Sequence, residues 1–155
     1  MGSIVAIIAA AIIAAYQHWA TVAREKRQRR DDAGRVERLC KAFGEQVIAG
    51  AAELARMSHA RDRELVAREF SRLREVLDFG RSVKVDQIPA DVVKPFMSLR
   101  AIGSEAADCA ESVHTKPHID LHSWARQFDK LRADAQKMYS EMDAAFKRAH
   151  QEFGG

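Results

Sequence analysis

The sequence has few of the residues that build disulfide frameworks, turns and sheets. It contains two cysteines, three prolines and eight glycines among 155 residues. So few cysteines exclude a small disulfide-stapled scaffold, and so few prolines and glycines disfavour a low-complexity chain or a sheet-rich fold with many turns. The length suits one domain with a core of its own. We therefore expect an all-α protein.

Motifs of catalysis are missing as well. The sequence contains no glycine-rich nucleotide loop, no nucleophile elbow and no zinc-protease helix motif. Its acidic residues stand among basic ones, which is typical of solvated helix faces. We therefore expect no catalytic residues, no cofactor, no small-molecule substrate and no enzymatic activity.

Charge is absent from the start of the chain. Residues 4–16 are Ile, Val, Ala and a final Tyr, and the first charged residue is Arg24. A helix of roughly 20 residues, from Ser3 to about Val22, is long enough to cross a hydrocarbon core of about 30 Å. We expect residues 1–23 to be a membrane-spanning anchor. Because the strongly apolar part is short, a surface-lying helix and a cleaved signal peptide are the alternatives.

Aromatic and then basic side chains follow the apolar run. Residues 24–31 form a basic juxtamembrane segment with no counterpart before the anchor. This asymmetry predicts that the N-terminus lies outside a bacterial inner membrane and that the rest is cytoplasmic. The segment also suits anionic lipid headgroups. The expected membrane-interface residues are Tyr16, Trp19, Arg24, Lys26, Arg27, Arg29 and Arg30.

The rest of the chain is electrically balanced. The formal net charge of +3 is carried entirely by residues 24–38, so the body has no broad basic surface. Nucleic acids are bound mainly through such surfaces. We therefore expect no nucleic-acid partner.

Apolar residues recur in three- and four-residue steps through residues 32–153, which form the expected domain. This spacing predicts roughly four antiparallel helices packed as a bundle. We expect Asp31 or Asp32 to begin the first helix and Asp62 to cap the second. One continuous helix over residues 32–79 is the alternative.

Glycine and proline positions suggest where the later helices begin and end. Gly80 is expected to end the second helix, and Pro89 suits the first turn of the third. Pro95 predicts a kink or a late start in that third helix, because proline disfavours helical geometry at the preceding residue.

The last segment carries the clearest heptad pattern, which could seat a partner helix. A second candidate surface is the run of small residues between Gly103 and Ala110. The partner-binding candidates on the last segment are Leu121, Trp124, Phe128, Leu131, Met138 and Met142.

Three histidines stand at four-residue intervals near the start of the last helix. His114, His118 and His122 are the metal-binding candidates, although solvated loop histidines are the simpler interpretation. Cys40 and Cys109 fall on apolar stripes and are expected to remain reduced in the cytoplasm.

These features predict a single-pass membrane protein whose helical body binds a partner protein, or a second copy of itself, as a scaffold, adaptor or regulator. One span followed by a charged helical body also resembles the layout of phage inner-membrane spanins, which implies a periplasmic body and a role in lysis. A third hypothesis is a metal- or pH-responsive sensor that uses His114, His118 and His122.

Overall fold

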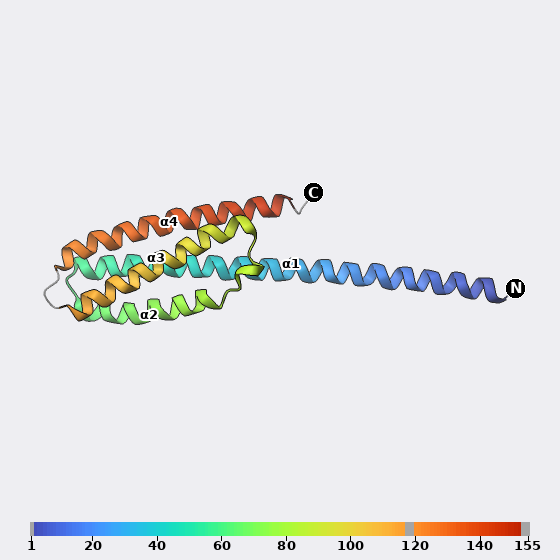
Figure 1. Cartoon of the computed structure of the whole chain (residues 1–155), viewed down its shortest axis with the longest axis horizontal. Helices are drawn as coiled ribbons and strands as arrows, with labels where there is room; N and C mark the ends of the chain where they lie inside the picture. The colour runs from blue at the N-terminus through green and yellow to red at the C-terminus, as the bar shows by residue number, and fades with distance from the viewer. Residues whose placement is uncertain (1, 117–119, 153–155) are drawn as a thin grey trace. The chain divides into compact units, whose positions relative to one another are not determined.

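The residues that the structure describes form four α-helices and one short 3-10 helix (Figure 1). The structure, a computed structural model, describes the backbone of residues 2–116 and 120–152 and the side chains of residues 16–116 and 120–151. The elements are α1 (Gly2–His59), α2 (Arg63–Ser82), η1 (Val85–Gln87), α3 (Ala90–Thr115) and α4 (Leu121–Glu152). The described residues include no strand. The prediction of an all-helical protein is confirmed.

The chain divides into two compact units, residues 1–35 and residues 36–155. Helix α1 contributes to both, because it runs without a break from Gly2 to His59. The second unit is an antiparallel bundle of the last part of α1 with α2, α3 and α4, and α3 packs against both α2 and α4 (Figure 1). The predicted helical bundle is confirmed.

The membrane-spanning segment stays a prediction. Within the part of the chain that the structure describes, no helix is long and apolar enough to cross a bilayer. The side chains of residues 1–15, which make up most of the expected span from Ser3 to Val22, lie outside that part.

The expectation that Asp31 or Asp32 begins a helix is wrong. Both lie inside α1, where the surrounding residues are mostly Ala, Arg, Glu and Gln. Such residues favour a helix, and without a proline to interrupt it the helix simply continues.

The break between the first two bundle helices lies at residues 60–62. The N–H of Asp62 donates to the carbonyl of Met57 at 3.0 Å, and that of Arg61 donates to the carbonyl of Ser58 at 3.1 Å. This pair of bonds is the Schellman arrangement that closes a helix C-terminus. Arg61 takes the left-handed position at φ 60°, which glycine usually occupies. Residues 32–79 therefore belong to two helices.

Asp62 caps α2 as predicted. Its carboxylate accepts a hydrogen bond from the N–H of Leu65 at 3.0 Å. This bond satisfies one of the donors that a helix leaves free in its first turn.

Gly80 does not end α2 and Pro95 does not delay the start of α3, whereas the predicted kink at Pro95 stays a prediction. Helix α2 continues past Gly80 to Ser82, because Gly80 is needed for close packing and has an ordinary negative φ. A Cβ at Gly80 would meet the ring of Phe43. Helix α3 already begins at Ala90, since the carbonyl of Pro89 accepts the N–H of Val92 at 2.8 Å, so Pro95 does not delay its start.

The core of the bundle is built in layers along the four helices. Phe43 of α1 packs against Phe96 of α3, with ring centroids 5.4 Å apart, and both side chains are fully buried. Gly103 of α3 faces Leu77 and Val47 at the next level. Burying such side chains contributes about 1.5 to 3 kcal/mol each, which is the main force that holds the helices together.

Candidate functional site

Most of the predicted partner-binding residues of α4 lie in the core. Phe128 and Met142 are fully buried, and Leu121 and Leu131 are nearly so. Trp124 and Met138 are partly buried and pack against the same core. The heptad stripe of α4 is thus covered by helices of this chain, and these side chains do not form an open groove.

The run of small residues on α3 is also used inside the bundle. Gly103, Ala106 and Ala110 are buried. A Cβ at Gly103 would stand only 3.0 Å from a methyl group of Leu77 and 3.3 Å from one of Val47. These small residues therefore allow α1 and α2 to approach α3.

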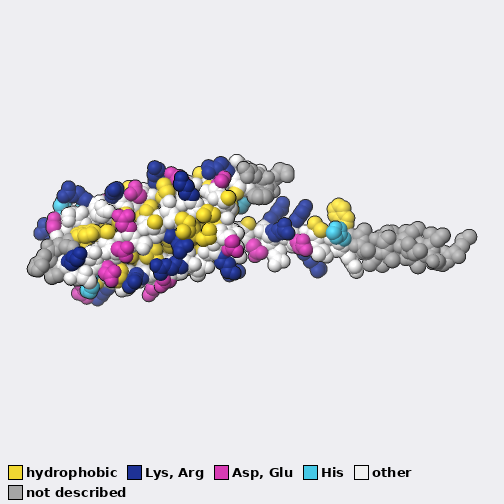
Figure 2. All heavy atoms as spheres, in the orientation of Figure 1, with side chains coloured by type: hydrophobic (Ala, Val, Ile, Leu, Met, Phe, Trp, Pro, Cys, Tyr) yellow, Lys and Arg dark blue, Asp and Glu magenta, His cyan; other side chains and the backbone are white. Residues whose placement is uncertain are grey.

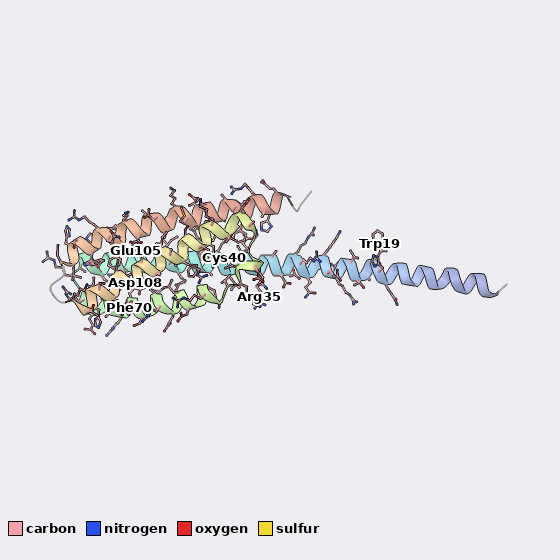
Figure 3. All side chains as sticks on the ribbon, viewed as in Figure 1. Trp19, Arg35, Cys40, Phe70, Glu105 and Asp108 are labelled. Atoms are coloured by element: carbon pink, nitrogen blue, oxygen red, sulfur yellow. The ribbon has the colours of Figure 1, made fainter. Side chains whose placement is uncertain are left out.

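The expected membrane-interface residues lie on α1 and are exposed. The side chains of Tyr16 and Trp19 are each 76% exposed, and Figure 3 shows that Trp19 stands clear of its helix. The exposed basic residues that follow are Arg24, Lys26, Arg27, Arg29 and Arg30. Successive residues of an α-helix are turned by about 100°, so these five charges are distributed around the helix.

The structure describes two of the three histidines of the predicted cluster. His114 is exposed in the last turn of α3, His122 is exposed in the first turn of α4, and His118 lies outside the described residues. The ring of His122 instead stands beside His59 of α1, with centroids 6.0 Å apart. The Nε2 atom of His59 lies 3.0 Å from an oxygen of Asp129.

Sequence spacing could not find His59, because its partners come from a helix far along the chain. Among the described residues, no group of three or more His, Cys, Asp or Glu side chains is placed to hold a metal ion. The metal-binding hypothesis depends on His118 and stays a prediction.

The two cysteines are free and belong to different levels of the bundle. Contacts of Gly44 with Leu99 and of Gly103 with Val47 fix the register of α1 against α3. This register places Cys109 about 20 Å along the bundle from the level of Cys40, too far for a disulfide. In Figure 3, Cys40 and Asp108, the neighbour of Cys109, accordingly lie toward opposite ends of the bundle.

The thiols are protected by their surroundings. Burial, with a smaller contribution from the charge of Glu37, raises the pKa of Cys40 to about 12. Burial, helped by Glu105 and Asp108, raises the pKa of Cys109 to about 11. Both thiols stay protonated at neutral pH, so neither is an activated nucleophile.

A row of polar contacts ties α1 to α4. The Nζ atom of Lys41 lies 2.8 Å from a carboxylate oxygen of Glu37 and 2.7 Å from one of Asp143. One turn further along α1, Glu45 accepts a hydrogen bond of 2.9 Å from the hydroxyl of Tyr139. Because Glu37, Lys41 and Glu45 are spaced by four residues, they present one polar edge of α1 to α4.

This row shifts the pKa values of its acids. Partial burial works to raise the pKa of Glu37, but hydrogen bonds from Lys41 and His150 outweigh it and hold the pKa below its ordinary value. The Nε2 atom of His150 lies 2.6 Å from Glu37. Hydrogen bonds from Lys147 and Lys41 lower the pKa of Asp143. Both carboxylates therefore stabilise the fold only while they are ionised.

A shallow groove lies between α2 and α3. Its lining contains no acidic side chain and consists of Leu77, Arg81, Met97, Arg100, Ala101 and Ser104. The Met97 side chain is 43% exposed. Phe79 of α2, which is not part of the lining, is 38% exposed. Figure 2 shows hydrophobic side chains on the surface of the bundle with Lys and Arg side chains beside them. The groove thus joins an apolar floor to cationic walls.

The two arginines of the groove differ in their contacts. Arg81 is exposed and pairs with Asp78 on its own helix at 2.8 Å. Arg100 is only partly exposed, and its guanidinium lies 3.6 Å from the sulfur of Met97. No ion pair joins Arg100 to a carboxylate within the described residues. Sequence reasoning missed the groove, because periodicity does not show which surface side chains of α2 and α3 become neighbours.

Comparisons with protein-family models, with curated proteins and with solved structures find no match to this chain.

Proposed function

We propose that this chain is a single-pass protein of a bacterial inner membrane, with its N-terminus outside, whose cytoplasmic four-helix bundle binds a partner protein as a scaffold, adaptor or regulator. The observation that carries the proposal is the order of residues along the unbroken helix α1. An apolar run is followed by the exposed aromatic residues Tyr16 and Trp19 and then by the basic residues 24–30. This is the order that a helix needs where it leaves a bilayer on the cytoplasmic side.

The distribution of charge supports a crossing helix over one that lies flat on the membrane. A flat helix keeps its charges on one face and buries an apolar face among the acyl chains. Residues 24–30 are helical and exposed, and their basic side chains surround the helix and leave no apolar face. Such a ring of cations suits a helix that passes upright between anionic headgroups.

The bundle is suited to binding a protein. Its helices bury their apolar stripes against one another, so the fold does not require another chain to complete its core. Its surface nevertheless keeps Phe79, Val85 and Met97 partly exposed, and Met97 shares a groove with Arg81 and Arg100. Methionine, arginine and aromatic residues are enriched in protein interfaces.

Two reporters fused to the C-terminus of the full chain test the orientation. A fluorescent protein that matures only in the cytoplasm should be active, and alkaline phosphatase, which needs the periplasm, should be silent. The opposite pattern would support an envelope-spanning lysis component with a periplasmic body and overturn the proposed orientation.

The basic segment provides matched variants for the same experiment. Replacing Arg24, Lys26, Arg27, Arg29 and Arg30 by Gln should reduce the cytoplasmic signal, because the positive-inside asymmetry is lost. Replacing five exposed basic residues of the bundle, namely Arg126, Lys130, Arg132, Lys137 and Arg148, should leave the orientation unchanged. Retention of the full chain in membranes washed with alkaline carbonate tests the span itself, because a surface-lying helix would be released.

A further inference from the structure

The groove between α2 and α3 joins a small apolar surface to two guanidinium groups. Met97 of α3 supplies an exposed apolar side chain, Leu77 of α2 is almost completely buried at the floor, and Arg81 and Arg100 contribute positive charge. We propose that this groove binds an acidic amphipathic helix of a partner protein, with an apolar side chain on the exposed Met97 and carboxylates on the arginines. The proposal rests on the proposed function, since it names the chemistry of the partner that the bundle binds.

Arg100 is the centre of the argument. It is partly buried on α3 without an ion pair to a carboxylate in the described residues, whereas Arg81 already has Asp78. Partly removing a cation from water costs free energy that a carboxylate partner recovers, and the flat guanidinium fork matches a carboxylate in geometry. An incoming acidic side chain would therefore gain more at Arg100 than at the more exposed arginines of α4.

The surroundings favour an acidic helix over a lipid surface. A bilayer presents a continuous layer of negative charge, and the exposed carboxylate of Asp78, which pairs with Arg81 beside the groove, would oppose it. A helix carries its acidic residues at discrete positions and can place them on Arg81 and Arg100 while avoiding Asp78. The exposed Met97 adapts to apolar side chains of different shapes, because its side chain is long and unbranched.

The experiment measures binding of a labelled peptide to the full chain held in nanodiscs of uncharged phosphatidylcholine. The peptide is a designed helix about four turns long, with Leu along one face and Glu on both sides of that face. A second peptide has Gln in place of every Glu. The protein variants are Arg81→Gln with Arg100→Gln and, as a matched control, Arg126→Gln with Arg132→Gln, which removes two exposed charges from α4.

The Glu peptide should bind the unaltered protein, and the R81Q/R100Q variant should bind it about tenfold more weakly. The R126Q/R132Q control should bind it as the unaltered protein does, and the Gln peptide should bind weakly to all three. The groove proposal would be overturned by absence of Glu-peptide binding, by an equal loss of affinity in the two double variants, or by equal binding of the Glu and Gln peptides. Circular dichroism should show closely similar melting temperatures for both double variants, because none of the four arginines is part of the buried core.

An assay with vesicles of phosphatidylglycerol distinguishes a lipid occupant of the groove from a peptide occupant. If R81Q/R100Q weakens attachment to these vesicles and leaves peptide binding unchanged, the occupant is lipid and the proposal is overturned. The carbonate wash is a separate measurement. A chain that is washed off membranes but still binds the Glu peptide would refute the anchor alone, and a retained chain that ignores the peptide would refute the groove alone.

Discussion

Replacing Gly80 by Ala should destabilise the bundle, although alanine is the better helix former. In the interior of a helix the change gains about 1 kcal/mol from backbone propensity. The new methyl group, however, would point into the ring of Phe43, where the Cβ position lies 2.7 Å from Cδ2 and 2.8 Å from Cζ. Real Cβ atoms do not approach other atoms so closely, so the ring or the helix must move.

The ring has little freedom to move. Phe43 is fully buried and packs against the ring of Phe96, which is fully buried as well. Overpacking of a dense core costs about 1 to 3 kcal/mol, and here three ring atoms are displaced at once. The cost should exceed the gain in propensity, so we expect a net loss of about 1 to 2 kcal/mol.

Urea denaturation of the full chain in detergent, followed by helical circular dichroism, measures the change. Gly50→Ala is the matched comparison, because its Cβ would meet a terminal methyl of Leu73 at 3.0 Å, which can shift, and an oxygen of Glu69 at an ordinary 3.6 Å, so this variant should keep part of the propensity gain and stabilise the protein by up to about 1 kcal/mol. Adding Phe43→Leu to Gly80→Ala should make the combined loss smaller than the sum of the single losses. If Gly80→Ala stabilises the protein, the proposed packing of α1 against α2 is wrong.

Four further changes test other parts of the bundle by the same denaturation assay. Arg61→Gly should stabilise it by about 1 kcal/mol, because glycine adopts the left-handed conformation at φ 60° without strain; Arg61→Ala should show no such gain. Ser58→Ala should stabilise it by about 1 kcal/mol, since the buried hydroxyl has no hydrogen-bond partner among the described residues, and a loss would reveal an unseen partner. The pKa values of Glu37 and Asp143 lie below their ordinary values, so the stability that the two ionised carboxylates contribute is present above about pH 4.5 and is lost as the pH falls. The E37Q/D143N variant should therefore lose less stability than the unaltered protein between pH 6 and 3. Burial raises the pKa of Glu69 against the opposing effect of Arg72, so the stability that its protonated side chain contributes is lost as the pH rises through that pKa. The Glu69→Gln variant should therefore gain stability relative to the unaltered protein between pH 4 and 7. A change of opposite sign would show that the ion pair with Arg72 dominates.

The apolar periodicity of the sequence predicted which residues are buried better than it predicted which residues bind a partner. The stripe of α4 is buried, as its three- and four-residue spacing requires. Spacing shows that a face is covered, but it does not show whether another chain or the same chain covers it. Phe128 and Met142 were therefore expected at a partner surface and lie instead in the core of the bundle.

Sequence motifs predicted features that depend on neighbouring residues of the chain. They did not predict features that depend on a residue from another helix. Asp62 caps α2 through a bond to a residue three positions away, so the sequence alone could predict it. Gly80 was expected to end a helix, because the sequence does not show that Phe43 occupies the space beside it. His59 was missed for the same reason, since its contacts with His122 and Asp129 cross from α1 to α4.

The sequence by itself determined the helical class, the positions of the apolar stripes and the basic segment behind the apolar start, because these depend on composition and on spacing within a turn or two. Only the tertiary structure decided which stripes meet, that Cys40 and Cys109 stand at different levels, and that Arg81 and Arg100 share a groove. The physical reason is register: the levels at which helices pack are set by how large side chains such as Phe43 fit beside small ones such as Gly80. That fit depends on all four helices together.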